Sequence, residues 1–175
     1  RIKCLNERES CKIAQYHIYK EDSTKKEYLE KMIRVCMNME MNKKASNCIT
    51  ELKKEGNLTP EMILTECSIS RNLKEYEKCN KLLKDSVDIF KKLDETKEDS
   101  LKHFIEYYLE FAALKFDEVD YRYGLGIMEK ALGLCQSEPN KTEKLTPIVF
   151  LVMGIFSENL GKFEDSFNYY GKAFD

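Results

Sequence analysis

The chain has 175 residues with 29 basic and 31 acidic side chains, and its formal net charge of −2 argues against a surface built wholly for nucleic acid. Three prolines and seven glycines leave little room for the turns of a sheet protein, so we expect an all-helical fold. The longest apolar run, residues 148–156, is far shorter than the ~20 residues that cross a bilayer, and it predicts a buried helix.

Residues 1–22 predict a single helix, with Cys4, Cys11 and Ile18 on one side. No partner for this helix precedes it, so we interpret it as the second helix of a truncated preceding repeat. Because Arg1 is not a start residue, we expect the sequence to be a fragment of a longer protein.

A first complete hairpin is predicted over residues 23–57. Asp22 or Ser23 can cap its first helix, in which apolar residues recur at three- and four-residue spacing. The second helix of this hairpin is expected at 43–54, and Gly56 ends it.

A second hairpin is predicted over residues 58–100. Thr59-Pro60 marks its start, because a hydroxyl cap followed by proline in the first turn is typical of a helix N-terminus. We expect helices at 60–71 and 75–93, followed by a polar loop at 94–100.

The third hairpin is predicted over residues 101–139, with helices at 101–115 and 121–135 and a loop at 137–141. Thr146-Pro147 then repeats the cap-plus-proline start, and this places the first helix of a fourth hairpin within residues 140–175.

In the fourth hairpin, Gly161 is the expected turn between the two helices. Antiparallel helices approach closely only where small residues face each other, and Gly154 and Ser166 have the right spacing to do so. We expect Phe163 and Tyr170, one turn on, to fill the space that remains.

The same order of small, aromatic, small, large and small residues recurs upstream at steps of 42, 45 and 34 residues. The first two sets are Gly154, Phe163, Ser166, Tyr170, Ala173, and Ala112, Tyr121, Gly124, Met128, Ala131. The other two are Cys67, Tyr76, Cys79, Leu83, Ser86, and Ile33, Asn42, Ala45, Ile49, Leu52, of which the last fits well only at Ala45 and Ile49.

Phe150, Met153 and Gly154 also occupy the W-x2-L-G places of the tetratricopeptide pattern, and Ser166, Tyr170 and Ala173 follow with the spacing of its second helix. The chain therefore resembles the tetratricopeptide repeat family, with periods longer than the ~34-residue standard unit. The resemblance implies an all-α, right-handed superhelix of antiparallel helix hairpins.

The resemblance further implies a non-catalytic scaffold or adaptor in a larger complex. In the family, successive first helices form a groove that binds a peptide or a segment of a partner protein. Carried over by spacing, the groove residues are Arg34, Met37, Asn38, Leu64, Ser68, Arg71, Asn72, Leu109, Phe116, Leu151, Ile155 and Asn159.

Two other functions remain open. One is a regulatory solenoid that senses a signalling peptide and needs an effector domain outside this sequence. The other, less favoured, is an RNA-binding helical repeat, against which the interrupted and paired arrangement of the basic residues speaks.

The sequence offers few candidates for chemistry. The only histidines, His17 and His103, fall in different predicted units and belong to no H-E-x-x-H motif. Gly124-Leu125-Gly126 lacks the third glycine of a dinucleotide-binding loop. We therefore predict no enzymatic activity, no bound cofactor and no metal site.

Seven cysteines form no C-x-x-C pair, which excludes the common zinc and redox motifs. Cys67 and Cys79 fall on two facing small-residue positions, where free buried thiols act as small hydrophobes. The odd number favours a reducing compartment, and we expect an intracellular protein of the cytoplasm or nucleus.

The first helix of the fourth hairpin is apolar nearly all round, at Ile148, Leu151, Val152 and Ile155. Something should therefore cover this end, and we expect further solenoid repeats or a partner chain. No membrane partner is expected, and the charge argues against nucleic acid.

Overall fold

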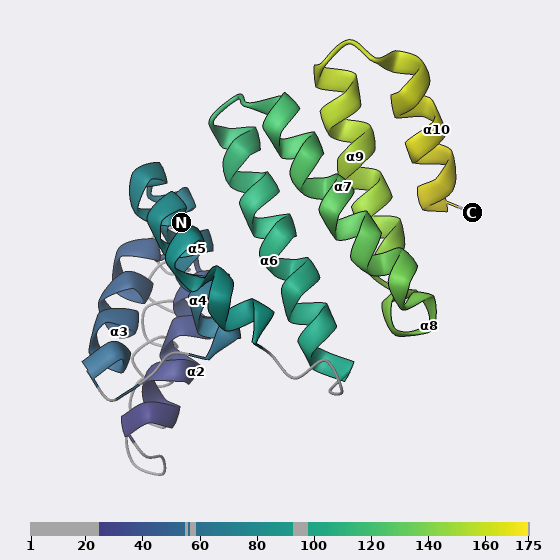
Figure 1. The fold of residues 1–175 in the computed structure, drawn as a ribbon. Coiled ribbons are helices and arrows are strands. Elements are labelled where there is room, and N and C mark those ends of the chain that lie inside the picture. Colours follow the sequence, from purple (N-terminus) through teal and green to yellow (C-terminus); the bar gives the residue numbers. More distant parts are fainter. Residues whose placement is uncertain (1–24, 55, 57–58, 93–97, 175) are drawn as a thin grey trace, which may run out of the picture. The chain divides into compact units, whose positions relative to one another are not determined.

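The computed structural model describes residues 25–54, 56, 59–92 and 98–174 (Figure 1). Over these residues the chain is all-helical, has no strand, and packs its helices in adjacent pairs, which confirms the predicted class. Two compact units are present, one up to residue 58 and one from residue 59 onward. The predicted helix at 1–22, the caps at Asp22 and Ser23, and His17 lie outside the described residues.

The first unit contains the pair α2 (Lys25–Asn38) and α3 (Asn42–Lys54). Both helices are amphipathic and pack their apolar sides together. The buried residues are Leu29, Ile33 and Cys36 on α2 and Ala45, Ile49 and Leu52 on α3.

The second unit begins with α4 (Pro60–Asn72) and α5 (Tyr76–Lys91). The predicted start at Thr59-Pro60 is confirmed, since the Thr59 hydroxyl accepts a hydrogen bond from the backbone N–H of Met62 at 3.4 Å. Cys67 and Cys79 are both fully buried free thiols, as their small-residue positions predicted.

The next pair is α6 (Glu98–Asp117) and α7 (Tyr121–Ser137). Because α6 already begins at Glu98, the last three residues of the polar loop predicted at 94–100 are helical instead. Polar residues tolerate the first turn of a helix, so composition alone set this boundary too late. Asp120 caps α7 by accepting a hydrogen bond from the backbone N–H of Tyr123.

A short helix α8 (Pro139–Thr142) precedes α9 (Thr146–Asn159) and α10 (Phe163–Phe174). The loop predicted at 137–141 is therefore wrong. Thr146 is also not a cap, because its hydroxyl donates to the Thr142 carbonyl at 3.0 Å from inside the helix. The buried Thr142 hydroxyl lies 3.0 Å from the Cys135 carbonyl and so ties α8 to the end of α7.

Four turns between paired helices have the same backbone geometry. Each has one residue with a positive φ, and these are Glu40 (56°), Lys74 (61°), Val119 (61°) and Gly161 (71°). In each turn the next backbone N–H donates to a carbonyl five residues earlier, at 2.8–2.9 Å, as in a Schellman motif. The turns lie 34, 45 and 42 residues apart. The local structure therefore repeats at the steps that the residue-size pattern predicted.

At two positions a small residue is needed because two helices approach closely there. The Ser166 hydroxyl donates to the Gly154 carbonyl at 3.0 Å, and a Cβ at Gly154 would lie 2.5 Å from the Tyr170 ring, which confirms the predicted contact. Phe163 does not fill this space, because it is 71% exposed. A Cβ at Gly124 would lie 2.4 Å from the Phe156 ring, so Gly124 makes room for α9 of the next hairpin.

Candidate partner-binding face

Two first helices of the second unit, α4 and α6, pack beside each other. On each helix a set of mostly polar residues recurs at spacings of three, four and seven, which places the set on one side of the helix. We call this surface the α4–α6 face. Its residues are Glu61, Leu64, Ser68 and Arg71 on α4 and His103, Glu106, Glu110 and Asp117 on α6.

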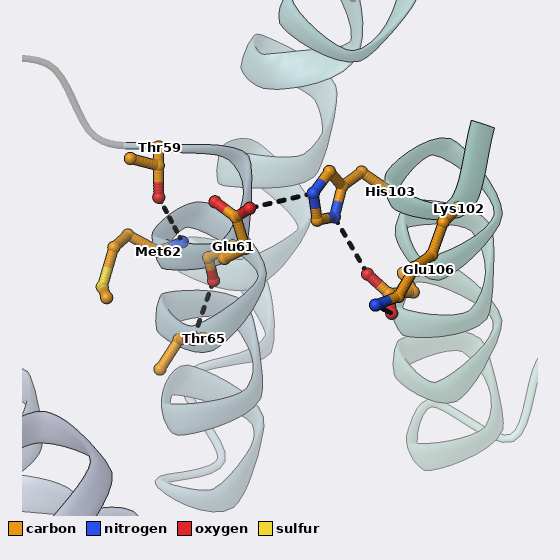
Figure 2. A network of polar contacts seen from close by, with 7 residues as sticks. All are labelled: Thr59, Glu61, Met62, Thr65, Lys102, His103 and Glu106. Carbon is orange, nitrogen blue, oxygen red and sulfur yellow. Dashed lines mark hydrogen bonds and ion pairs between the residues drawn. The ribbon is translucent and has the colours of Figure 1, made fainter. Parts of the chain in front are cut away.

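His103 joins the two helices at one end of the face (Figure 2). Its Nε2 lies 2.9 Å from Oε1 of Glu61, and its Nδ1 lies 3.1 Å from Oε2 of Glu106. The imidazole side chain is only 13% exposed. Because a carboxylate faces each ring nitrogen, the doubly protonated imidazolium could donate both hydrogen bonds.

The pKa of the Glu61 carboxyl lies below its ordinary value. Partial burial raises this pKa, but hydrogen bonds from the Thr59 hydroxyl and from the backbone N–H of Glu61, together with His103 and Lys102, outweigh burial. The folded protein therefore keeps this carboxylate ionised to lower pH than a free glutamate.

Arg71 joins the same two helices at the other end of the face. Its Nε lies 2.8 Å from Oδ2 of Asp117, and its Nη1 lies 3.0 Å from Oε1 of Glu110. The three side chains are between 17% and 30% exposed. One guanidinium thus pairs with two carboxylates in a partly buried site.

The electrostatic balance of this cluster is uneven. Burial raises the pKa of Glu110, and neighbouring Asp117 adds to the increase, although Arg71 opposes both. Burial lowers the pKa of Arg71, but Glu110 and Asp117 outweigh it and the net shift is upward. The guanidinium therefore stays charged, while partial burial makes the Glu110 carboxylate costly to ionise.

Between the two clusters the face is less polar. Glu61 and Arg71 are ten residues apart on α4, which corresponds to about 15 Å along a helix axis. Leu64 and Ser68 lie between them and are half-buried. The α4–α6 face thus has an ion-pair cluster at each end and the uncharged Leu64 and Ser68 of α4 between them.

The sequence-predicted groove residues fall into three places. Leu64, Ser68 and Arg71 lie on α4 near α6, together with Asn72 at the end of α4. Arg34, Met37 and Asn38 lie on α2 in the first unit, and Leu151, Ile155 and Asn159 lie on α9. None of the twelve predicted residues, Leu109 and Phe116 included, is buried.

Some of these residues already have partners within the chain. The Asn159 side-chain amide donates to the Ile155 carbonyl at 2.8 Å. Phe116 is 37% exposed, and its ring centroid lies 5.8 Å from that of Phe156. Arg71 is paired as described above, so it is not a free cation at the groove surface.

Sequence reasoning missed Glu61, Glu106 and Glu110 and treated His103 as an isolated residue. Their spacing along each helix was readable, because His103, Glu106 and Glu110 follow at three and four residues. The partner of His103 on α4 was not readable, since that contact depends on how two hairpins stack.

Within the described residues, no group of three or more histidine, cysteine, aspartate or glutamate side chains is arranged to hold a metal ion. None of the helices described combines the length and apolar character needed to cross a membrane.

Comparison with known proteins found no protein-family model that matches the chain and no curated protein with significant similarity to it. The tetratricopeptide resemblance therefore stays a prediction from residue spacing and is taken up below as part of a proposal.

Proposed function

We propose that this protein is a non-catalytic scaffold whose successive first helices bind a peptide or an extended segment of a partner protein. The hairpins would form a tetratricopeptide-like right-handed solenoid, and the α4–α6 face would be part of its binding groove. The recurrence of one turn geometry at 34-, 45- and 42-residue steps supports the repeat architecture.

Accessibility of the predicted groove residues is the observation that carries the proposal. All twelve are exposed or half-buried, whereas their neighbours Ile63, Cys67, Ile69 and Ser70 on α4 are buried. The side of α4 that carries Leu64 remains accessible and is therefore available to another chain.

The charge of the α4–α6 face indicates the chemistry of the segment it would bind. Four carboxylates, from Glu61, Glu106, Glu110 and Asp117, face one guanidinium, one imidazole and the Lys102 ammonium, which lies 4.0 Å from Glu106. This acidic excess favours a segment that places an apolar side chain over Leu64 and a basic side chain near either cluster. It disfavours the acidic tails that some family members bind.

A reducing compartment agrees with the cysteines that the structure describes. Cys36, Cys67, Cys79 and Cys135 are buried free thiols, and Cys48 is a half-buried one. We propose an intracellular location on this ground.

A pull-down from cell lysate tests the function. The bait is the full chain, compared with Ser68→Arg on the α4–α6 face and with Ser137→Arg at the exposed end of α7 as the matched control. We expect the full chain to retain a discrete polypeptide after nuclease treatment and at high salt. The Ser68→Arg bait should no longer retain it, and the Ser137→Arg bait should retain it as the full chain does.

Three results would each contradict part of the proposal. Material recovered only in salt- and nuclease-sensitive form would favour the RNA-binding alternative. Equal recovery by both variants would remove the α4–α6 face from the binding surface. A short peptide recovered in place of a protein would favour the peptide-sensing alternative.

A further inference from the structure

The last described helix, α10, carries a stripe of exposed phenylalanines. Phe163, Phe167 and Phe174 are 71%, 81% and 84% exposed. They are four and seven residues apart, so they lie within about 40° of one another around the helix. Three large aromatic side chains on one side of a helix form an exposed apolar patch.

The internal repeat indicates what this patch would contact. Gly161 corresponds to Val119 in the turn geometry, so Phe163 corresponds to Tyr121 and Phe167 to Leu125 on α7. Leu125 is only 8% exposed, in contrast to Phe167. The two helices thus have matching positions with opposite exposure.

The difference between α7 and α10 is a neighbouring helix. The first helix of the next hairpin, α9, packs on α7. Its Phe156 ring centroid lies 6.4 Å from that of Tyr121, and the same ring closes over Gly124. On α10 the matching residue Phe167 is 81% exposed, so none of the described helices covers that side of α10.

We propose that the α10 stripe binds an amphipathic helix of a partner protein, aligned on α10 as α9 is aligned on α7. The partner helix carries apolar residues at three- and four-residue spacing, and one of them covers Phe163 as Phe156 covers Tyr121. This site is separate from the α4–α6 face and goes beyond the groove function proposed above.

A helix fits the patch better than the other candidate occupants. A second copy whose stripe packed against this one across a two-fold axis would place α10 on α10, whereas the repeat interface pairs a second helix with a first helix. Glu164 is exposed and lies about 60° from Phe167 around the helix, so an anionic membrane surface would repel it. The same carboxylate favours a basic residue on the partner helix.

A synthetic hairpin with the sequence of residues 139–174 serves as the probe, because its α9 already packs on a second helix. Phe163→Ser, Phe167→Ser and Phe174→Ser in the probe remove its own stripe. The probe also carries Phe156→Ala. On α10, the helix that would bind the probe, Ser166 stands at the position of Gly124, so it leaves less room for the Phe156 ring. Fluorescence anisotropy of the labelled probe is measured while the full chain is added.

We expect saturable binding with a Kd on the order of 100 µM or tighter. Phe163→Ser/Phe167→Ser in the full chain should weaken binding at least tenfold, where the order of magnitude follows from losing two buried aromatic contacts. Ile89→Ser, at a 45% exposed position on α5, is the matched control and should change binding less than about twofold.

Several outcomes would overturn the proposal. Absence of saturation, or equal binding by the double-serine variant, would show that the stripe is not a helix-binding site. If the chain alone sediments as a dimer and the double-serine variant sediments as a monomer, the stripe binds a second copy instead. Stripe-dependent binding to phosphatidylserine vesicles would assign it to a membrane. Ser68→Arg should leave probe binding unchanged, which separates this test from that of the groove.

Discussion

Glu61 and His103 lie 2.9 Å apart, between Oε1 and Nε2, although they come from the first helices of two successive hairpins (Figure 2). With Arg71 and Asp117, which are 2.8 Å apart at the other end of the face, they define how α4 and α6 align. Both contacts are partly buried and join two successive hairpins. The predictions that follow concern this alignment and the tight contact between α7 and α9.

His103→Ala should destabilise the protein by about 0.5–1.5 kcal/mol, because it removes the polar contacts of the imidazole with Glu61 and Glu106. This loss of stability is at the low end for a contact with a charged group, since the Glu61 side chain is 54% exposed and solvent screens its interaction with His103. Urea denaturation measures the change. Lys102→Ala is the control, since its 4.0 Å contact with Glu106 is exposed and should be worth less than about 0.5 kcal/mol. Equal effects of the two variants would contradict a specific role for His103.

Glu61→Gln should reduce the loss of stability in acid. Because the pKa of Glu61 is lower in the folded protein than in the unfolded chain, its contribution is present above the unfolded pKa and is lost as pH falls through the folded pKa. The difference in unfolding free energy between wild type and Glu61→Gln should therefore shrink as pH falls below about 4. Thermal denaturation between pH 3 and pH 7 measures it, and a difference that grows in acid would contradict the assigned direction.

Arg71→Ala should cost about 2–4 kcal/mol, because it leaves Glu110 and Asp117 partly buried without their shared cation. The pKa of Glu110 is already raised, and loss of Arg71 should raise it further. A group with a raised folded pKa contributes stability at low pH and loses it as pH rises through that pKa. The cost of Arg71→Ala should therefore be smaller at pH 5 than at pH 7.

Arg122→Ala is the control for Arg71→Ala, because Arg122 is exposed on α7. It should change the unfolding free energy by less than about 0.5 kcal/mol at either pH. A cost of Arg71→Ala that does not depend on pH would show that lost packing, rather than the unpaired carboxylates, explains the effect.

Gly124→Leu should destabilise the protein by about 1–3 kcal/mol, because the new side chain overpacks the contact with Phe156. The clash arises between hairpins, so the α7–α9 contact should loosen before the α6–α7 hairpin does. Hydrogen exchange along α9 would detect this. Gly133→Ala is the control on the same helix, where nothing lies within 4 Å, and it should stabilise by about 0.5–1 kcal/mol. An unchanged thermal midpoint for Gly124→Leu would contradict the helix register.

Much of the helical framework could be predicted because its signals are local. Apolar spacing identified the paired helices, and Thr59-Pro60 and Gly161 marked a start and a turn. Predictions from local signals were wrong where a side chain makes its hydrogen bond to a different helix. Residues 139–141 were predicted as part of a loop, yet they belong to α8, which the Thr142 hydroxyl holds by donating to the Cys135 carbonyl.

The candidate site was only partly predictable for the same reason. Leu64, Ser68 and Arg71 were expected on an accessible side of the second hairpin, and they lie on the α4–α6 face. The pairing of residues across this face could not be predicted. Glu61 and His103 are far apart in the chain, and a hydrogen bond between them requires a precise separation.

By itself, the sequence determined where most of the paired helices lie, the turn at Gly161 and the steps at which the pattern of residue sizes recurs. These properties depend on spacing within a few turns of one helix, which the order of residues contains directly. Only the tertiary structure decided that Gly124 accommodates Phe156, that Phe163 is exposed and that His103 pairs with Glu61. Each of those depends on which surfaces of different helices meet, and many sequences with the same periodicity could pair those surfaces differently.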